Sequence, residues 1–583
     1  MCLSDDEKLI LLLLASSEAI ISNGEEDVDN NNINYRVVGT FPKPEINDAI
    51  AVVIDETPYP LSPSPEDNLT YVGSGPIATQ GYYYAHVKEG STNEITSQEP
   101  FTRQPTQSDT DYEFYNRSRA YWDIPALPNL YNPLFHRKKS DLHLDGQIAT
   151  VHFTGNSTEL IDIHGNAMNE DAFVMVNMTF IRGQELHTFE DVKMELSGRS
   201  SRWNPKLSYS IKIPKEGGTS LYGYRRLKLR SLFSDPSYIR EALVYHILRA
   251  SGLATTDFSY VRVFINQKSA GFFGLIENFK NPWLNNEFAN GDPDYQQGNL
   301  YQARLVADIF SPGGRISDLS YEGNNASHYK EGQYKIKEDP SDKNRSYEPL
   351  IGLIKFLENA PVDNITAWEQ HFNMETVLRS MALEVVLGFS DGYSTLADNY
   401  YVYQNGLNAG QFIYIPSDVD LSVGSTMSKL SNMLSGDYRT YPGFLRRPLT
   451  RQFLRVPEFK ERFEEILQQL ASHLVNPSVL NPIIDGIADM IRQDVEWDQS
   501  LPRLGTTEID ILANQTSSIF DDKLSGIIDD AAIKDAFERP QPLPFDTAVN
   551  GPTGHISLTG VKEYIANSSR AILSFYGKQQ ENE

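Results

Sequence analysis

Short runs of β-branched and aromatic residues, separated by Pro- and Gly-rich turns, mark the first part of the chain. The runs at 35–38, 49–54 and 82–87 predict strands of a small β-sandwich or meander. Residues 88–119 have no hydrophobic period and predict a linker. The acidic, Asn-rich stretch 24–34 predicts a flexible spacer, so we expect ordered structure to begin near Tyr35.

A second set of strands is expected from Ile148 onward. Within it, hydrophobic and polar residues alternate at Val174, Val176, Met178 and Phe180, which predicts a strand with one buried face. Further predicted strands cover residues 149–153, 192–196, 207–213, 260–265 and 271–276. The last two should form a hairpin closed by residues 266–270.

Helical periodicity dominates the second half of the chain. Asp235 and Pro236 predict a helix start, and Gly252 predicts its end. Residues 281–347 are rich in Gly, Asn and Asp and predict loops. The clearest helix spans 457–474, with one apolar stripe formed by Phe459, Phe463, Ile466, Leu467 and Leu470. We therefore expect an α+β fold, with a sheet-rich part over about 148–280 followed by a helix-rich part over about 347–583.

Composition excludes several classes of function. The 583 residues contain 78 Asp and Glu against 51 Lys and Arg, and the net charge of −27 argues against binding to nucleic acid or to anionic membranes. Cys2 is the single cysteine, so neither an intrachain disulfide nor a cysteine zinc site can form. The 11 His show no HExxH spacing, and no Gly-x-Ser-x-Gly occurs. The sequence therefore argues against a metalloprotease and against an esterase.

The N-terminal region favours export. The apolar run Leu9–Ala15 has the length of a signal-peptide core and is too short to span a bilayer. Acidic residues 5–7 stand where a cationic region is expected, and a misplaced start codon or a plain N-terminal helix would also explain this pattern. No second apolar stretch has membrane length, so we expect a secreted or cell-surface protein with no transmembrane span.

Nine Asn-x-Ser/Thr triplets fit an exported glycoprotein. Their asparagines are Asn68, Asn116, Asn156, Asn177, Asn325, Asn344, Asn364, Asn514 and Asn567. Such triplets also arise by chance, and they matter only if the chain enters the secretory pathway of a eukaryote.

A predicted hairpin delivers carboxylates to one place. Its strands begin at Tyr400 and Phe412, and Asp418 and Asp420 follow two residues apart in a segment expected to be extended, so both side chains should point the same way. Two such oxygen ligands suit Mg²⁺ or Ca²⁺, with Asn399 as a third. The alternative, a loop that caps backbone amides, is more common for an isolated Asp-x-Asp pair.

Cations alternate with leucines nearby in the sequence. Arg226, Lys228 and Arg230 should line one face of a strand, and in an acidic chain they need a partner. Nucleotide phosphates are one candidate and the carboxylates above are another, while exposed salt bridges explain the pattern equally well. The Gly- and Ser-rich turn 197–202 offers backbone amides to an anion.

Together these segments resemble the CotH family of atypical, secretory-type kinases, known from bacterial spore coats and from surface proteins of certain fungi. The matching segments, in order, are Arg226-Leu-Lys228-Leu-Arg230, Asp235-Pro-Ser-Tyr-Ile-Arg240-Glu, Val261–Asn266 with Gly274–Glu277, Asp391-Gly-Tyr, Asn399-Tyr-Tyr, Pro416-Ser-Asp418-Val-Asp420, Arg447-Pro-Leu, Pro457-Glu-Phe and Asp494-Val-Glu-Trp-Asp498. The N-terminal β module and the Glu-Trp-Asp segment are similar to the fungal branch in particular.

The resemblance implies an atypical protein-kinase-like fold over residues 120–583, after a signal segment and spacer (1–34) and a β module with linker (35–119). It implies that Lys228 contacts ATP phosphates, that Asp391 is catalytic, and that Asp418, Asp420 and Asn399 surround Mg²⁺ or Mn²⁺. The expected cofactor-binding set is completed by Arg226, Glu277, Ser201 and Lys206, with Glu277 pairing with Lys228 or binding the metal. Arg240 is carried over from the family pattern, and its place on a capped helix also suits a structural ion pair.

Two positions depart from the family pattern, and both bear on nucleotide binding. Ser417 stands where the family has Trp before the acid, and Ser197-Gly198-Arg199 stands where the family has Arg-Gly-Asn.

Two functional hypotheses follow. The first is an ATP- and metal-dependent Ser/Thr kinase that acts on Ser-rich extracellular or coat proteins. The second is a surface adhesin, invasin or spore-coat protein whose kinase-like site is inactive, a pseudokinase that binds a host-cell receptor. Retention of Lys228, Asp391, Asp418 and Asp420 favours the kinase. Carbohydrate binding through Tyr82-Tyr-Tyr84 ranks last, because such aromatics more often belong to a core or an edge strand.

Overall fold

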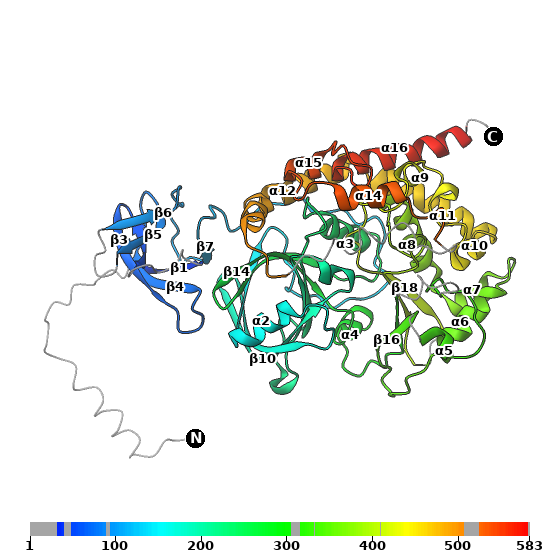
Figure 1. Cartoon of the computed structure of the whole chain (residues 1–583), viewed down its shortest axis with the longest axis horizontal. Coiled ribbons are helices and arrows are strands. Elements are labelled where there is room, and N and C mark those ends of the chain that lie inside the picture. Colours follow the sequence, from blue (N-terminus) through cyan, green and yellow to red (C-terminus); the bar gives the residue numbers. More distant parts are fainter. Residues whose placement is uncertain are drawn as a thin grey trace, which may run out of the picture. The chain divides into compact units, whose positions relative to one another are not determined.

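The computed structural model describes residues 32–39, 48–88, 94–304, 315–330, 333–407, 410–505 and 524–580 (Figure 1). The chain divides into two compact units. The first comprises residues up to 36 with 44–62 and 71–110, and the second comprises 37–43, 63–70 and everything from 111 onward. The expected signal segment and the sequon at Asn514 lie outside the described residues, so they stay predictions.

The first unit is built around one sheet. Its strands are β1 (Asn32–Val38), β2 (Asp48–Ile54), β3 (Thr57–Pro63), β4 (Thr70–Pro76), β5 (Tyr82–Lys88) and β6 (Ile95–Gln98), which lie in the order β6-β5-β2-β3-β4-β1. The predicted strands β1, β2 and β5 are confirmed. Strand β3 was not expected because it contains Pro58 and Pro60, which pair with Val53 and Ala51 of β2. The linker predicted over 88–119 contains β6 and, in the second unit, β7 (Tyr112–Phe114).

A closed β-barrel begins the second unit. It consists of β8 (Ile148–Gly155), β9 (Phe173–Arg182), β10 (Glu185–Ser197), β11 (Ser208–Lys212), β12 (Arg226–Arg230), β13 (Phe258–Ile265) and β14 (Lys268–Glu277), closed in the order β10-β11-β12-β14-β13-β8-β9 (Figure 1). The predicted buried face of β9 is confirmed, because Val174, Val176, Met178 and Phe180 all lie in the barrel core. Helix α2 (Ser157–Gly165) contacts β9.

The turn between β13 and β14 is tighter than predicted. Only Asn266 and Gln267 separate the strands, and both have positive φ, 47° and 63°. Two residues in this conformation match the twist of the flanking strands, so the pairing continues through Lys268.

Helix α3 (Arg240–Ala250) starts later than predicted. Tyr238 has a left-handed φ of 57°, which is incompatible with a helix that begins at Pro236. Asp235 instead accepts hydrogen bonds from the backbone N–H of Ser237 and of Arg240 and forms an ion pair with the buried Arg240 guanidinium. This ion pair is structural. The helix ends before Gly252, as predicted.

The segment predicted as loops between residues 281 and 347 contains regular structure, so that prediction was wrong. It forms α4 (Trp283–Phe288), β15 (Leu300–Ala303), α5 (Ser327–Lys330) and β16 (Tyr334–Glu338). The strands complete a four-stranded sheet, β16-β15-β17-β18, with β17 (Tyr400–Gln404) and β18 (Phe412–Pro416). Because β15 is stabilised by pairing with β17 about a hundred residues later, its short sequence carries little local signal.

Helices make up most of the remaining structure. They are α6 (Glu348–Glu358), α7 (Ile365–His371), α8 (Met374–Leu387), α9 (Leu430–Met433), α10 (Pro448–Phe453), α11 (Pro457–Gln469), α12 (Pro477–Ser500), α14 (Asp530–Glu538), α15 (Phe545–Asn550) and α16 (Val561–Gln580). Helix α11 and the π-helical turn Leu470–Leu474 bury the predicted apolar stripe, and α11 packs against α8. The fold is mixed α+β, as predicted.

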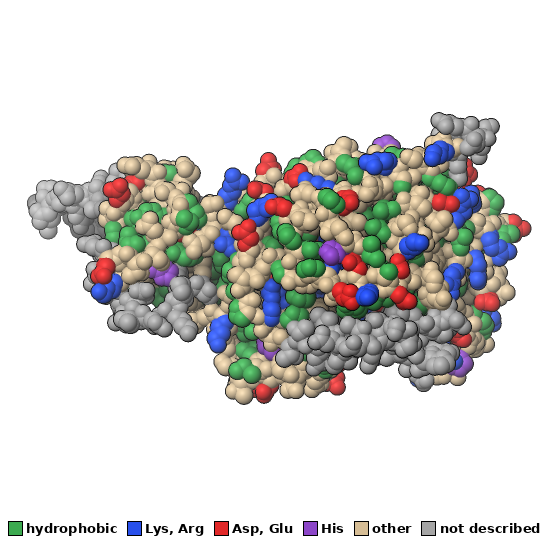
Figure 2. All heavy atoms as spheres, turned by 45° about the horizontal axis from the view of Figure 1, so that its top comes forward, with side chains coloured by type: hydrophobic (Ala, Val, Ile, Leu, Met, Phe, Trp, Pro, Cys, Tyr) green, Lys and Arg blue, Asp and Glu red, His purple; other side chains and the backbone are tan. Residues whose placement is uncertain are grey.

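The surface of the second unit mixes charges of both signs. On the face shown in Figure 2, Lys and Arg are interspersed with Asp and Glu and with hydrophobic side chains. Among the described residues, no helix has the length and apolar character that a membrane span needs.

Candidate functional site

Strand β12 positions two cations at the edge of a cavity. Leu227 and Leu229 point into the barrel core, so Lys228 and Arg230, which alternate with them, face the other way. Burial lowers the pKa of Lys228, and the neighbouring Arg230 lowers it further. A partly dehydrated ammonium beside a guanidinium is a strong anion-binding pair.

The two predicted carboxylates meet these cations. Arg230 Nη2 lies 2.5 Å from Asp418 Oδ1 and 3.1 Å from Asp420 Oδ1, and Lys228 Nζ lies 3.8 Å from Asp418 Oδ2. The segment is not extended as expected, because Asp418 has a left-handed φ of 54°. Burial favours the neutral carboxyl, but Arg230 and Lys228 hold the pKa of Asp418 below its usual value. Asp418 is therefore charged at neutral pH.

Asp391 and Asn399 come from the loop that joins α8 to β17. Asn399, with a φ of 59°, donates from Nδ2 to Asp391 Oδ2 over 2.6 Å. Burial raises the pKa of Asp391 well above its usual range, and the nearby charges of Asp420, Asp418 and Asp398 add to the effect. The hairpin thus gathers four acids, as the sequence predicted for three of them.

A cavity of about 220 Å³ lies in front of these groups. Lys228, Arg230, Asn399, Asp418 and Glu277 line it, whereas Asp391 and Asp420 do not line it themselves and contact residues that do. The cavity is rich in positive charge, because Arg199, Arg304, Lys335 and Lys337 line it as well. Arg199 pairs with Asp398 over 2.6 Å.

Three of these cations were missed by sequence reasoning. Arg304, Lys335 and Lys337 come from β16 and the end of β15, in the segment predicted as loops. None of the three side chains forms an ion pair with any described residue. Burial lowers the pKa of Lys337 to about 7, and the charges of Lys280, Lys228, Lys335 and Arg304 contribute. The alternation Lys335-Ile336-Lys337 is the signal that could have found them.

A family model described as CotH kinase protein matches residues 194–518, more than half of the 583 residues. The chain belongs to the CotH family. The matched range contains all the residues placed at the cavity except Glu170, which lies before it.

Curated CotH relatives come from fungi and bacteria. Invasin CotH2 of Rhizopus delemar is 26% identical over 400 residues, covering 67% of this chain and 65% of that protein. Spore coat protein homolog 1 of the same fungus is 25% identical over 475 residues, covering 79% and 72%. Inner spore coat protein H of Bacillus subtilis is 23% identical over 312 residues, covering 53% and 78%. The match therefore spans just under two thirds of Invasin CotH2.

Other residues expected at the CotH site lie elsewhere or have different partners. Lys206 does not line the cavity: it forms an ion pair with Asp498 over 2.7 Å, and burial lowers its pKa to about 8. Ser201 also does not line the cavity, which the turn reaches through Ser197, Gly198 and Arg199 instead.

The remaining two expected residues, Glu277 and Arg226, border the site. Glu277 forms its ion pair with Arg137, not with Lys228. Arg226 lies on the same strand as Lys228, and its charge acts on Glu338 and Lys280, but it is not part of the cavity lining.

The oxygen ligands near the cavity suit a metal ion that is held partly by the protein and partly by a phosphate ligand. Among the described residues, no three His, Cys, Asp or Glu side chains come together to hold a metal ion. Asp418 and the amide of Asn399 both line the cavity, with Asp420 behind them. Mg²⁺ in nucleotide sites is held by one or two carboxylates and by substrate phosphates, so the residues present fit that kind of site.

Proposed function

We propose that this CotH protein is an atypical kinase, with a kinase-like fold, that transfers the γ-phosphoryl group of ATP to Ser or Thr hydroxyls. One observation carries the proposal: a single cavity joins the unpaired cations of β16, the Lys228 and Arg230 pair of β12, and the charged Asp418. Phosphoryl transfer needs this combination of positive charge for the phosphates and oxygen ligands for the metal.

Each group has a role in this proposal. Lys228, Lys337 and Arg304 bind the phosphates, while Asp418, Asp420 and Asn399 hold Mg²⁺ or Mn²⁺. When bound, the metal ion neutralises phosphate charge. Arg230 keeps Asp418 and Asp420 together before ligand arrives.

Asp391 orients the acceptor hydroxyl and accepts its proton. Its raised pKa favours the protonated carboxyl before a cation binds beside Asp418 and Asp420. Positive charge placed next to Asp418 and Asp420 lowers that pKa, so the base becomes available only in the loaded site.

We propose that the protein acts outside the cell, at a cell surface or spore coat, on Ser- and Thr-rich proteins. The names of the relatives support this location, since they include invasins and spore coat proteins. Seven sequon asparagines are exposed and accessible to glycosylation: Asn68, Asn116, Asn156, Asn177, Asn325, Asn344 and Asn364.

A non-catalytic surface adhesin or coat protein is the second candidate. The Arg230 side chain favours it, because its Nη2 lies within hydrogen-bond distance of both Asp418 and Asp420. An arginine that stayed there would compete with a metal ion for the same oxygens. Relatives named as invasins are consistent with this role.

A thermal-shift titration separates the two candidates. ATP with Mg²⁺ or Mn²⁺ should raise the melting temperature of the wild type, because the ligand binds the native state. Asp418→Ala should lose the shift, whereas Asp363→Ala, an exposed residue before α7, should keep it. If millimolar ATP with either metal leaves the melting temperature unchanged, the kinase proposal fails and the non-catalytic adhesin is favoured.

A further inference from the structure

A second cavity, of about 290 Å³, lies away from the predicted catalytic residues. Its walls come from α3, α12, the start of β13 and the segment 124–147 that precedes the barrel. All of its lining residues are described, and its volume is close to the lower end of the roughly 300–1,000 Å³ that small-molecule pockets occupy.

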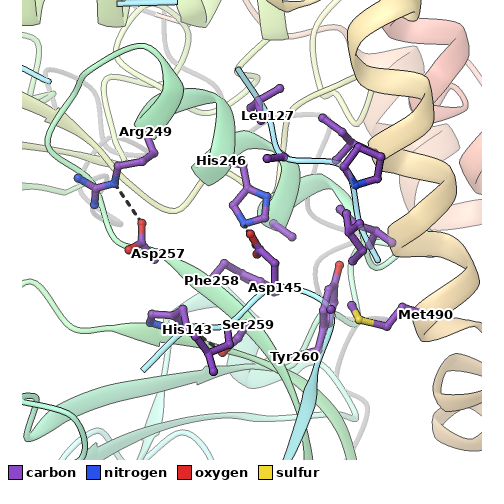
Figure 3. Close-up of a pocket in the computed structure, with 18 of the residues that line it drawn as sticks. Leu127, His143, Asp145, His246, Arg249, Asp257, Phe258, Ser259, Tyr260 and Met490 are labelled. Atoms are coloured by element: carbon purple, nitrogen blue, oxygen red, sulfur yellow. Dashed lines mark hydrogen bonds and ion pairs between the residues drawn. The ribbon is translucent and has the colours of Figure 1, made fainter. Parts of the chain in front are cut away.

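One side of this cavity is apolar. Ile483, Ile487 and Met490 of α12 line it opposite Leu127, and Phe258 and Tyr260 of β13 contribute aromatic rings. Figure 3 shows Tyr260 and Met490 on one side, His246 and Asp145 facing each other in the middle, and Arg249 with Asp257 on the other side. An occupant therefore has an apolar body and a polar head.

Arg249 and His143, two of the basic side chains of the cavity, already face protein carboxylates. Arg249 donates from Nε to Asp257 over 3.0 Å and from Nη1 to Glu287 over 2.9 Å, and its Nη2 bonds to the carbonyl of Thr255. His143 Nε2 faces the Glu277 carboxylate at 3.4 Å, and its Nδ1 is 2.9 Å from Ser259 Oγ. Arg249 thus has little capacity left to bind an anion.

Two oxygen atoms of the cavity, in the Asp145 carboxylate and the Tyr260 hydroxyl, can still accept hydrogen bonds. Asp145 has 72% of its side chain exposed, and the basic side chain that faces it is His246, whose Nε2 lies 3.8 Å away, beyond hydrogen-bond distance. The Tyr260 hydroxyl donates its hydrogen to the carbonyl of Tyr238, so its oxygen remains an acceptor. An ammonium group can pair with the Asp145 carboxylate, and the rings of Phe258 and Tyr260 line the same cavity.

We propose that this cavity binds a small organic amine, with an ammonium at Asp145 and an aliphatic or aromatic body against Met490 and Ile487. The proposal does not depend on phosphoryl transfer at the other cavity. Isothermal titration calorimetry of the full chain with 2-phenylethylamine tests it, with 3-phenylpropionate and 2-phenylethanol as the matched anion and neutral probe. The amine should bind tightest of the three.

Two variants locate the site. Asp145→Asn should weaken amine binding about two- to fivefold, as expected for one partly exposed charge pair, and leave 2-phenylethanol unchanged. Asp141→Asn, exposed on the same segment and outside the cavity lining, should have no effect. Ala242→Leu places a larger side chain into the cavity from α3, so it should abolish binding without lowering the melting temperature.

Equal or tighter binding of 3-phenylpropionate would overturn the assignment of an amine. Amine binding that survives Ala242→Leu would place it at another site. Failure of the amine to bind at millimolar concentration would also contradict the proposal.

Discussion

Asp391 lies among Asp398, Asp418 and Asp420, and its carboxylate accepts a side-chain hydrogen bond from Asn399. Because its pKa is raised in the folded state, the folded protein holds this proton to higher pH than the unfolded chain does. Asp391 therefore lowers the free energy of unfolding as pH rises above the usual aspartate pKa, until the raised folded pKa is reached. Because neighbouring acids contribute to this raised pKa, a cation bound beside them should lower it.

Asp391→Asn should stabilise the protein at pH 7 and have no effect near pH 4. The amide oxygen can still accept the hydrogen bond from Asn399, and the variant has no carboxyl whose ionisation in the unfolded chain favours unfolding above pH 4. Thermal unfolding of wild type and variant from pH 4 to pH 8 measures the difference. A variant that melts at lower temperature than the wild type at every pH would show that the Asp391 charge is favourable in the fold.

Lys337 makes anion binding pH-dependent. Its folded pKa of about 7 means that the wild type gains stability as pH rises from about 7 toward the usual lysine value. A polyphosphate favours the charged lysine, so its affinity should fall as pH rises above 7. Lys337→Met should weaken tripolyphosphate binding about tenfold at pH 6, as for the loss of a charge-assisted hydrogen bond, and less at pH 9.

Lys335→Met is the matched control for this experiment. Lys335 lines the same cavity and is exposed, so removing its charge should weaken binding while the affinity still falls with rising pH. The fall should shift to higher pH, because the Lys335 charge helps to lower the pKa of Lys337. Identical pH profiles for the wild type and Lys337→Met would contradict the role of Lys337.

Helix α12 contacts the barrel through two buried acids, Asp494 and Asp498, which lie one helical turn apart. Asp494 accepts from Arg262 Nε and Nη2 over 2.7 and 2.9 Å. Asp498 pairs with Lys206 over 2.7 Å and accepts hydrogen bonds from the Tyr238 hydroxyl and the Phe272 backbone. The Glu-Trp-Asp segment therefore has a structural role here through Asp498, and so does Lys206.

Asp498→Ala should destabilise the protein by about 3–5 kcal/mol, because it leaves the Lys206 charge buried without its partner. Adding Lys206→Met should restore part of the loss. Asp489→Asn, on the exposed face of the same helix, should have little effect. Urea unfolding of the four proteins tests this, and a loss no larger than that of Asp489→Asn would contradict the buried-pair account.

The sequence predicted the elements whose formation depends on residues close together along the chain. The alternation in β9, the stripe of α11 and the β17–β18 hairpin were all predicted. The meeting of Lys228 with Asp418 was one of the alternatives that the sequence left open. The start of α3 could not be predicted, because the left-handed Tyr238 is held by contacts that span the fold. Likewise β15, β16 and Lys337 reach the site through pairing between strands far apart in the sequence.

For the whole molecule, the central feature is a cationic cavity in a chain of net charge −27. General acidity repels anions, so selective binding of a phosphate ligand needs local charge that the fold concentrates. Strands β12 and β16 supply positive charge, and the loop after β18 supplies the carboxylates, so three separate parts of the second unit meet at the cavity. Cations and carboxylates in one cavity are the combination that our proposal of phosphoryl transfer requires.

Phosphoryl transfer from radiolabelled ATP tests this account most directly. The full chain is incubated with ATP and Mg²⁺ or Mn²⁺, with dephosphorylated casein as a Ser-rich acceptor, and label is measured on casein, on the chain itself and as free phosphate. We predict metal-dependent transfer by the wild type and by Asp363→Ala, and none by Asp391→Asn or Asp418→Ala. No transfer to casein, to the chain or to water, or equal transfer by Asp391→Asn, would contradict the proposed kinase.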